Sequence, residues 1–144
     1  MTSWLLFNYK VPNDPSASRV YVWRKLKTLG AILLHDAVWV LPDLAQTREK
    51  LQWLTMEIRD MDGGEATLWR AEQLLADTPA DLVQKFREQA DAAFREILEG
   101  LERPDANLTT LARRYRQITQ QDYFAAAAGE QVRQRLIERR GSER

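Results

Sequence analysis

The order of strand-like and helix-like segments in the first half of the chain does most to limit the folds that this sequence can adopt. Residues 4–11, WLLFNYKV, alternate between two faces, one of which carries Leu5 and Phe7, and this alternation is typical of a strand with one buried face. Pro12 and Pro15 end this strand, because proline cannot donate to a sheet ladder. Three further runs have strand character: residues 31–34, 37–42 and 65–71.

Two amphipathic helices are expected between these strands. The first spans residues 16–29, where Ser16 or Ser18 can act as the N-cap. The second spans residues 44–61, whose apolar side chains recur at steps of three and four, with Asp43 as the cap. The resulting order, β-α-β-β-α-β, predicts a ferredoxin-like fold, in which an antiparallel four-stranded sheet carries both helices on one face.

The second half of the chain is predicted to be helical, because Ala, Gln, Glu and Arg dominate it and favour helix. A third helix begins after Thr78, its expected cap, and residues 102–107 form a break before a fourth helix. An arginine-rich segment follows, and residues 139–144 are expected to fray. The sequence therefore predicts an α+β chain, with a ferredoxin-like subdomain at residues 1–75 and a helical extension at residues 76–144 that together form one compact domain.

Composition narrows the classes of function. The chain has no cysteine, which excludes disulfides and thiolate chemistry. It has no apolar run of about 18 residues, and its start lacks the basic region of a secretory signal, so we expect a cytoplasmic protein that does not bind membranes. The net charge of zero conceals an asymmetry, because residues 1–30 carry five basic side chains and one acid, and residues 108–144 carry eight arginines and four acids. Nucleic-acid binding depends on the local field, so a neutral total does not exclude it.

The only histidine, His35, lies beside Asp36 between two apolar runs. Adjacent side chains of a strand point to opposite faces, so this pair cannot hold one metal ion together, and no second histidine or cysteine completes a site. A two-residue turn at this point would join two strands. We therefore favour a hairpin bend over a metal or acid–base site, with a bulge or a looser turn because Ala37 stands where a tight turn often has glycine.

The sequence contains no recognised catalytic motif. Asp60, Asp62 and Glu65 cluster around Gly63 and Gly64, at an expected helix end where they are solvated. The motifs of a nucleophile elbow, a phosphate-binding loop and a dinucleotide-binding turn do not occur. We therefore expect a protein that is not an enzyme and that uses no metal and no cofactor.

Basic side chains form three groups along the chain. The first group is on the first helix: Arg19, Arg24, Lys25 and Lys27. The second is Arg113, Arg114 and Arg116, and the third is Arg133, Arg135, Arg139 and Arg140. The first two groups are the candidate contacts to DNA phosphates or to another oxyanion, because phosphate binding requires cations and no exact motif. The alternative is a plain solvated helix face, on which some arginines only pair with nearby acids.

The tryptophans also have two interpretations. Four are expected in the sheet and the first helix, and one in the second helix: Trp4, Trp23, Trp39, Trp69 and Trp53. Packing in the core or in an interface is the simpler interpretation, and on the first helix Trp23 falls on the apolar arc of Val22 and Leu26. A platform on which bases stack requires several of the tryptophans on the open sheet face.

The stretch WLLFNYKVPNDPSASRVYVWRKLKTLGAILLHDAVWVLP, residues 4–42, resembles the N-terminal domain of the ChrB-type chromate-resistance regulators. Aromatic, basic and turn-forming residues carry the similarity: Trp4, Leu5, Leu6, Phe7, Tyr9, Pro12, Pro15, Ser16, Arg19, Trp23, Arg24, Leu26, Gly30, Ala31, Trp39, Leu41 and Pro42. The stretch RQITQQDYF, residues 116–124, is similar to a segment near the end of that domain through Asp122 and Phe124. The pattern is also similar to the regulatory domain of PaaX-type repressors and, more distantly, to the small subunit of CRISPR adaptation complexes.

The resemblance implies a homodimeric, DNA-binding transcriptional regulator of a chromate-efflux operon in a bacterial cytoplasm. Asn8, Tyr9 and Lys10 stand where the CRISPR subunit has a metal-binding acid, so a metal-dependent nuclease is not expected. Residues 1–75 show no helix-turn-helix order. Longer ChrB-type chains carry a second, C-terminal domain, and if that domain senses chromate, we expect that this chain does not do so alone.

Two alternatives to the DNA-binding regulator remain. One is a dimeric protein-interaction module that works with a separate sensor or DNA-binding subunit. The other is a sensor of chromate or another oxyanion that uses the same arginines. An exposed patch formed by Trp4, Trp69, Phe86 or Phe94 would favour the interaction module.

Overall fold

The computed structural model of the protein describes residues 3–12, 16–75 and 81–142. The chain forms two compact units, residues 1–77 and 78–144. The first unit holds, in chain order, β1 (Trp4–Lys10), α1 (Ala17–Thr28), β2 (Ile32–His35), β3 (Val38–Pro42), α2 (Ala45–Arg59) and β4 (Glu65–Ala71). The second unit holds α3 (Leu82–Leu101), α4 (Leu108–Gln120) and α5 (Ala128–Ser142). The predicted α+β class with a helical second half is confirmed.

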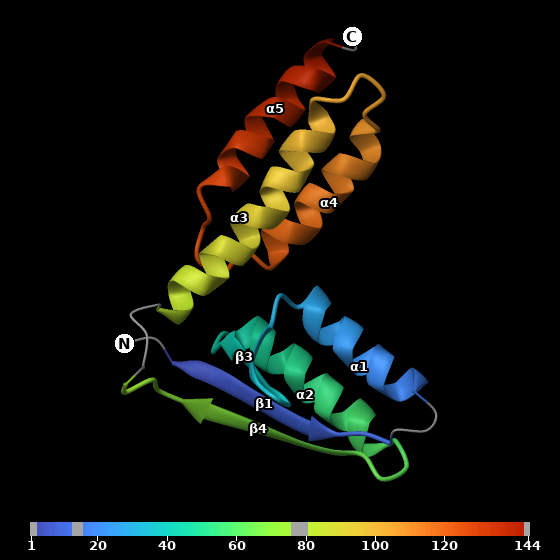
Figure 1. Ribbon diagram of the computed structural model, residues 1–144, viewed down its shortest axis with the longest axis vertical. Coiled ribbons are helices and arrows are strands. Elements are labelled where there is room, and N and C mark those ends of the chain that lie inside the picture. The colour runs from blue at the N-terminus through green and yellow to red at the C-terminus, as the bar shows by residue number, and fades with distance from the viewer. Residues whose placement is uncertain (1–2, 13–15, 76–80, 143–144) are drawn as a thin grey trace. The chain divides into compact units, whose positions relative to one another are not determined.

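The four strands form one antiparallel sheet in the order β2-β3-β1-β4. β1 is an inner strand, on which Phe7 is aligned with Trp39 of β3 and with Leu68 of β4. Both α1 and α2 lie on the same face of the sheet (Figure 1). The predicted element order, the antiparallel sheet and the placement of both helices on one face are therefore confirmed.

The core of the first unit lies between the sheet and these two helices. Leu5 and Phe7 are buried two positions apart on β1, as the alternation predicts. α1 contributes Val22 and Leu26, and α2 contributes a stripe at steps of three and four: Leu51, Leu54 and Ile58. Because side chains four positions apart share one side of a helix, Val22 and Leu26 determine which side of α1 is turned inward.

Trp23 is the exception to the apolar arc predicted for α1. Its side chain is 51% exposed, whereas the adjacent Val22 is fully buried. One residue turns a helix by about 100°, so the side chain after Val22 reaches the flank of α1 and not its inner side. Trp53 and Trp69 are also exposed, and Trp4 and Trp39 are buried. Packing in the core is therefore confirmed for Trp4 and Trp39 and excluded for the three exposed tryptophans, for which packing in an interface stays a prediction.

Residues 36 and 37 form the turn between β2 and β3, which confirms the predicted hairpin. Asp36 adopts a φ of 42°, in the left-handed region that aspartate tolerates better than most residues other than glycine. The pairing of β2 with β3 shifts register between Leu33 and His35, in agreement with the expected bulge.

The start of α2 differs from the prediction, because its N-cap is Leu44 and not Asp43. The fully buried Thr47 accepts a hydrogen bond from the Leu44 N–H at 3.0 Å and donates one, at 2.6 Å, to the carbonyl of the last residue of β3. The Asp43 carboxylate instead forms ion pairs with Arg48 at 2.7 Å and with Arg70 of β4 at 3.2 Å. Asp43 thus links the first turn of α2 to the edge of the sheet.

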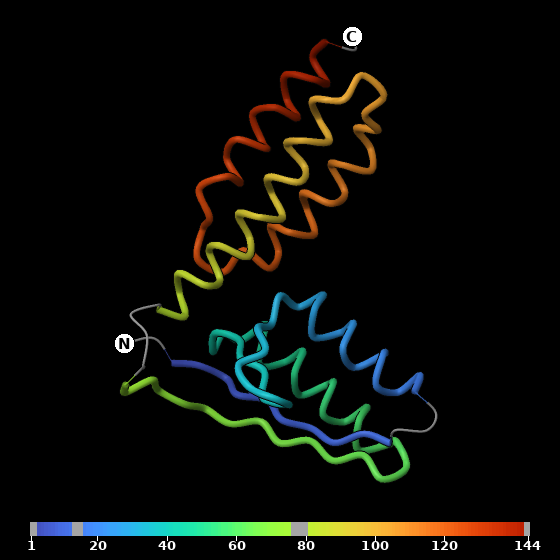
Figure 2. The backbone as a smooth tube through the Cα atoms, in the orientation of Figure 1, coloured from blue at the N-terminus to red at the C-terminus, as the bar shows by residue number. Residues whose placement is uncertain are grey.

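In the second unit, α3, α4 and α5 run side by side (Figure 2). They enclose one apolar core, which includes Phe94, Ile97, Leu101, Ala112, Ile118 and Val132. Gly129 permits the close approach of α5, since a Cβ at this position would lie 3.1 Å from the Phe94 ring. The three helices therefore form a bundle with its own core.

The ends of this bundle modify two expectations. α3 has Asp81 as its N-cap, and the carboxylate accepts a hydrogen bond from the Val83 N–H at 3.1 Å. Thr78, the expected cap, lies outside the described residues. α5 continues to Ser142, so the expectation of a frayed end from residue 139 is wrong up to that point.

Candidate functional site

The outward side of α1 carries the first group of cations that the sequence predicts. All four are exposed: Arg19, Arg24, Lys25 and Lys27. Within the described ranges, none of them forms an ion pair with a carboxylate. Val20, Tyr21 and Trp23 are exposed on the same helix. Since arginine and aromatic side chains are enriched at binding interfaces, α1 has the composition of an interface and not of a purely polar surface.

These cations lie on different sides of α1. Arg19, Trp23 and Lys27 follow one another at steps of four residues and form a stripe along one flank. The Lys27 ammonium lies 5.7 Å from the centre of the Trp23 ring. Arg24 lies next to this stripe, whereas Lys25 lies on the opposite flank. The structure therefore brings Arg19, Arg24 and Lys27 together and separates Lys25 from them.

The flank of α1 with Lys25 faces α2. A hollow of about 280 Å³ lies there, and Lys25, Trp53 and Glu57 line it. The Tyr21 hydroxyl donates a hydrogen bond to the Glu57 carboxylate, and this bond raises the pKa of Tyr21. Lys50 also lines this hollow, but the carboxylate of Glu57 weakens the positive field of the two lysines, so this flank is the less suitable side for a polyanion.

The flank with the stripe has a larger hollow, of about 510 Å³. Tyr9 of β1 lines it together with Arg19, Val20, Trp23 and Arg24 of α1. Burial raises the pKa of Tyr9, although a hydrogen bond with Trp39 and the nearby charge of Arg19 act in the opposite direction. No carboxylate among the described residues lines this hollow, so its polar groups are cations and hydroxyls.

The second predicted group, on α4, belongs to the other unit. Arg113, Arg114 and Arg116 are exposed. Arg113 and Arg116 are one helical turn apart and share a side, whereas Arg114 is turned away and donates a hydrogen bond to Gln117 at 2.9 Å. These arginines form a second cationic surface that stands apart from that of α1 in the chain.

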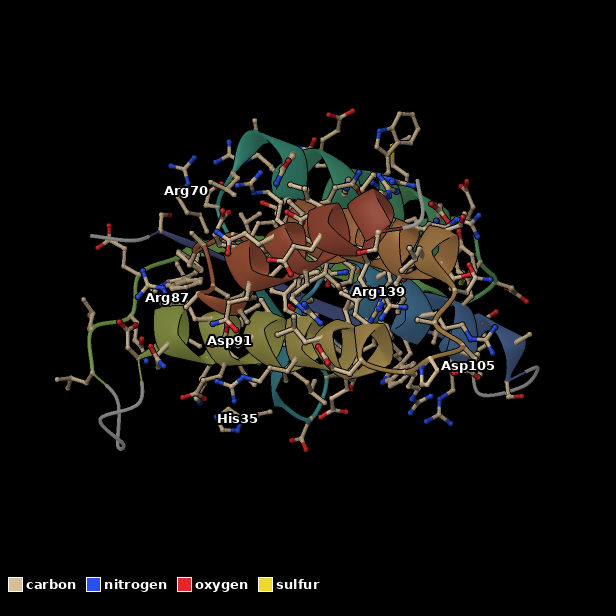
Figure 3. The ribbon with its side chains drawn as sticks, turned by 90° about the horizontal axis from the view of Figure 1, so that it is seen from above. His35, Arg70, Arg87, Asp91, Asp105 and Arg139 are labelled. Carbon is tan, nitrogen blue, oxygen red and sulfur yellow. The ribbon has the colours of Figure 1, made fainter. Side chains whose placement is uncertain are left out.

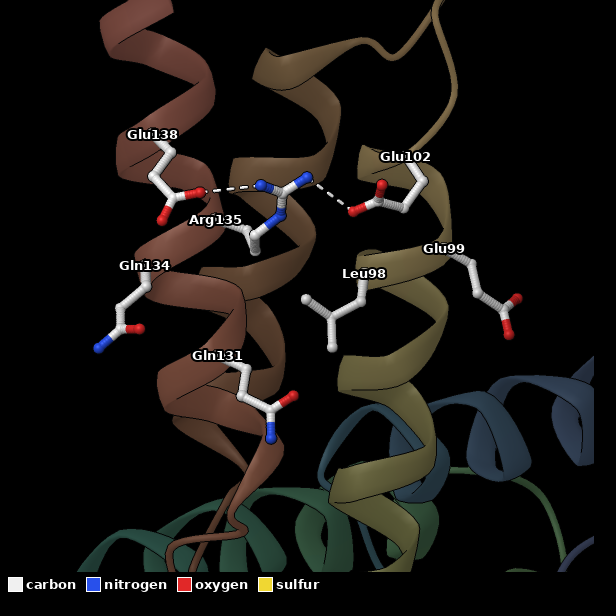
Figure 4. A pocket seen from close by; sticks show the side chains of 7 residues that line it. All are labelled: Leu98, Glu99, Glu102, Gln131, Gln134, Arg135 and Glu138. Atoms are coloured by element: carbon white, nitrogen blue, oxygen red, sulfur yellow. Dashed lines mark hydrogen bonds and ion pairs between the residues drawn. The ribbon is translucent and has the colours of Figure 1, made fainter.

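Two of the four arginines of the third group, Arg133 and Arg135, are neutralised by carboxylates of their own unit. Arg133 pairs with Glu130 at 2.6 Å, and Arg135 pairs with Glu102 at 2.7 Å and with Glu138 at 2.8 Å. Figure 4 shows the Arg135 guanidinium between these last two carboxylates, in a hollow of about 430 Å³ that Glu99 also lines. Three carboxylates around one guanidinium do not attract an anion, so this hollow is not a phosphate site.

His35 and Asp36 are exposed at the hairpin, and Figure 3 shows the His35 side chain at the periphery. In the described part of the chain, no three His, Asp or Glu side chains gather as a metal would require. None of the helices so described combines the length and apolar character that crossing a bilayer demands. The cationic surface of α1 and that of α4 are two separate candidate sites, one in each unit.

Comparison with known proteins identifies the family. Residues 19–109 match the family described as "Protein ChrB, N-terminal". The chain belongs to this family. It is also 31% identical over 98 residues to Protein ChrB of Cupriavidus metallidurans, and this match covers 68% of the chain and 26% of that relative. No solved structure matches the chain significantly.

Only one of the two cationic surfaces lies within the residues that match the ChrB family. Arg19, Arg24, Lys25 and Lys27 fall inside the matched residues, whereas the three arginines of α4 fall outside them. The resemblance to ChrB-type domains, stated from residues 4–42, is therefore confirmed for the family. The chain spans about a quarter of the length of the C. metallidurans ChrB that it matches.

A structural role, which the sequence did not reveal, accounts for Asp122 and Phe124, the residues of the second ChrB-like stretch. Both carboxylate oxygens of Asp122 accept hydrogen bonds from the Ala126 N–H, and the Phe124 carbonyl accepts one from Arg87 Nε at 3.0 Å. The Phe124 ring lies 5.9 Å from the ring of Phe86. These contacts attach the segment before α5 to α3. No local signal in the sequence indicates this role, because Phe86 and Arg87, which contact Phe124, lie 38 and 37 positions away from it on α3.

Proposed function

We propose that this chain acts in a bacterial cytoplasm as a transcriptional regulator of a chromate-resistance operon, and that it contacts DNA phosphates through α1. The observation that carries the proposal is the set of exposed cations on this helix, which no carboxylate of the described residues neutralises. Membership of the ChrB family supports the link to chromate resistance. We propose further that the regulator is a homodimer.

The geometry of α1 supports phosphate contacts. A helix of 12 residues is about 18 Å long, so cations along it can reach more than one phosphate of a strand. Each Lys or Arg that neutralises a phosphate releases condensed counterions, and this release drives binding at low salt. The zero net charge of the chain is compatible with this mode, because the acids lie elsewhere in the sequence and only the local field acts on a bound strand.

A salt-titrated gel shift with the full chain and the DNA upstream of its own gene tests the proposal. We expect retardation at low salt that weakens steeply as salt increases. The double variant Arg24→Gln/Lys27→Gln should bind more weakly. The matched double variant Arg133→Gln/Arg135→Gln, which removes two cations already paired with carboxylates, should bind as the wild type does. Absence of retardation at the lowest salt concentration would reject DNA binding.

One observation favours a protein-interaction module as a second candidate. Trp53 and Met56 of α2 are 59% and 54% exposed, and exposed apolar residues of this size mark docking surfaces when they lie together. The patch that the sequence suggested is not formed, because Trp4, Phe86 and Phe94 are buried. Light scattering of wild type and of Trp53→Gln tests docking through α2, since a smaller particle mass for the variant shows that this surface holds copies of the chain together.

A sensor of chromate would use the same guanidinium groups of Arg19 and Arg24, which border one hollow. Calorimetric titration with chromate and with sulfate tests this third possibility. Heats that are equal for the two dianions, or absent, argue against specific sensing by this chain.

A further inference from the structure

The hollow beside α1 is lined by two kinds of side chain, and together they define a class of ligand. Val20 and Trp23 offer apolar surface, whereas Tyr9, Arg19 and Arg24 offer hydrogen-bond donors. No described carboxylate lines the hollow. A complementary ligand is therefore an anion that also carries an apolar, flat part. An inorganic oxyanion such as chromate would leave the apolar wall without a contact.

The donors of this hollow are available to such a ligand. Arg19 and Arg24 are exposed and, among the described residues, make no ion pair. The Trp39 indole has no acceptor, so in its hydrogen bond with Tyr9 it must be the donor, and the O–H of Tyr9 remains to be donated. A guanidinium presents its donors in a fork that matches two oxygens of a phosphate.

The exposed indole of Trp23 provides a flat surface on which an aromatic ring of a ligand can stack. Its indole is half exposed on the flank of α1, next to the two arginines and under the ammonium of Lys27 at 5.7 Å. Bases of any sequence stack on such side chains, and cations beside them hold the flanking phosphates. The open sheet face lacks an equivalent platform, because Trp69 is exposed there but Trp4, on the same face, is buried.

We propose that this hollow binds one nucleotide whose base is unpaired, with the base against Trp23 and the phosphate at Arg19 and Arg24. This inference rests on the proposed nucleic-acid binding and names the form of nucleic acid that the hollow accepts. In a duplex the faces of the bases are covered by their neighbours, so only a free nucleotide or a single strand can stack a base on Trp23. Lys27 would contact the next phosphate of a strand.

The test measures the fluorescence anisotropy of a labelled single-stranded oligothymidylate and of a labelled duplex of equal length, with the full chain. Two pairs of variants are compared: Trp23→Leu with Trp53→Leu, and Arg24→Gln with Lys25→Gln. The first pair removes an indole and the second pair removes one positive charge, in each case once from the hollow and once from the α2 side of the first unit. Unlabelled thymidine monophosphate serves as the competitor, and circular dichroism verifies that every variant folds.

We expect Trp23→Leu to weaken single-strand binding by about tenfold, as the loss of one stacked base does, and Trp53→Leu to change it less than twofold. Arg24→Gln should weaken it more than Lys25→Gln. If the monophosphate competes, the hollow accepts free nucleotides; if it does not while the Trp23 effect persists, the ligand is a strand. Both results support the proposal.

Four results overturn it, in distinguishable ways. Binding to duplex alone, or equal losses for Trp23→Leu and Trp53→Leu, rejects the nucleotide site but leaves phosphate binding by α1 intact. Equal losses for Arg24→Gln and Lys25→Gln identify a general charge effect and likewise reject the site. Failure of the single strand, the duplex and the monophosphate to bind rejects both this site and the proposed function, whereas binding of the monophosphate alone retains the site and rejects DNA binding.

Discussion

Asp122 holds Ala126 through two hydrogen bonds, since both of its carboxylate oxygens accept from the Ala126 N–H, at 2.9 and 3.1 Å. Asp91 of α3 accepts from the Ala128 N–H at 2.9 Å, two residues further on. Ala125, directly before Ala126, has a φ of 54°, a left-handed conformation that costs a residue other than glycine about 1 kcal/mol. The two carboxylates therefore stabilise a backbone turn that its own sequence disfavours.

Replacement of Asp122 by Asn should remove one contribution that lowers the stability of the protein as the pH rises. Burial and the charge of Asp91 raise the pKa of Asp122, more than offsetting the hydrogen bond from Ala126. The folded state therefore binds a proton more tightly than the unfolded state, and the free energy of unfolding decreases as the pH rises from the ordinary pKa of 3.8 through the raised value. In Asp122→Asn this decrease is absent.

Urea denaturation at a series of pH values measures this effect. Asp105→Asn is the matched control, because Asp105 is exposed in the same unit. Parallel pH profiles for wild type and Asp122→Asn would contradict the role assigned to the carboxyl group.

Thr47→Val should destabilise the protein by about 0.5–1.5 kcal/mol, because it removes the buried hydrogen bonds of the hydroxyl, while the Leu44 N–H and the Pro42 carbonyl still bond to each other at 3.1 Å. The buried hydroxyl accepts from Leu44 N–H and donates to the Pro42 carbonyl. Thr47→Ser retains the hydroxyl and should keep most of the stability. A larger loss for Ser, which lacks the methyl group, than for Val, which lacks the hydroxyl, measured by urea denaturation at neutral pH, would show that the methyl group and not the hydrogen bonds stabilises the start of α2.

Asp43→Asn should destabilise the protein at neutral pH and have little effect in strong acid. The hydrogen bond from Arg48, followed by the charges of Arg48 and Arg70, lowers the pKa of Asp43. Its contribution is therefore complete above the ordinary pKa of 3.8 and is lost as the pH falls through the lowered value. We expect a loss of about 1 kcal/mol at pH 7, because the solvent around both arginines screens the ion pairs.

The acid limb of the unfolding profile checks this expectation, with the exposed Asp62→Asn as control. If the profiles of wild type and Asp43→Asn stay a constant distance apart down to the lowest pH, the ion pairs do not contribute as described.

The salt dependence of DNA binding should distinguish free from paired arginines. Arg24→Gln is expected to reduce the slope of log K against log salt by about one unit, the value for one lost phosphate contact. Arg133 already pairs with Glu130 at 2.6 Å, so Arg133→Gln should leave the slope unchanged. Anisotropy titrations at several salt concentrations give the slope for each variant. If Arg24→Gln and Arg133→Gln change the slope equally, free and paired arginines do not differ in DNA binding.

The architecture of the first unit could be predicted because its signals are local. Alternation on β1 identified Leu5 and Phe7 as buried, and the turn at Asp36 follows from the chemistry of two adjacent residues. Prolines marked the ends of strands, and apolar side chains at steps of three and four residues marked the helices. Each of these signals involves residues that are close together in the sequence, so contacts between distant residues do not alter it.

The details of the site depend on contacts between distant residues, and the sequence could not show those. Trp23 follows a buried valine, and its exposure depends on how α1 is rotated over the sheet. Asp43 resembles a helix cap, but its carboxylate pairs with Arg48 of α2 at 2.7 Å and with the distant Arg70 of β4 at 3.2 Å. The sequence identified the cations of α1 and left open which of them face the hollow with Tyr9.

The irregular pairing of β2 also affects how this chain can associate. β2 is an edge strand of only four residues, and the register shift between Leu33 and His35 interrupts its row of backbone groups. Short, bulged edges resist the addition of a further strand. The opposite edge, β4, has seven residues in unbroken register with β1. A second polypeptide that extended this sheet would therefore join it at β4, beside Trp69 and Arg70.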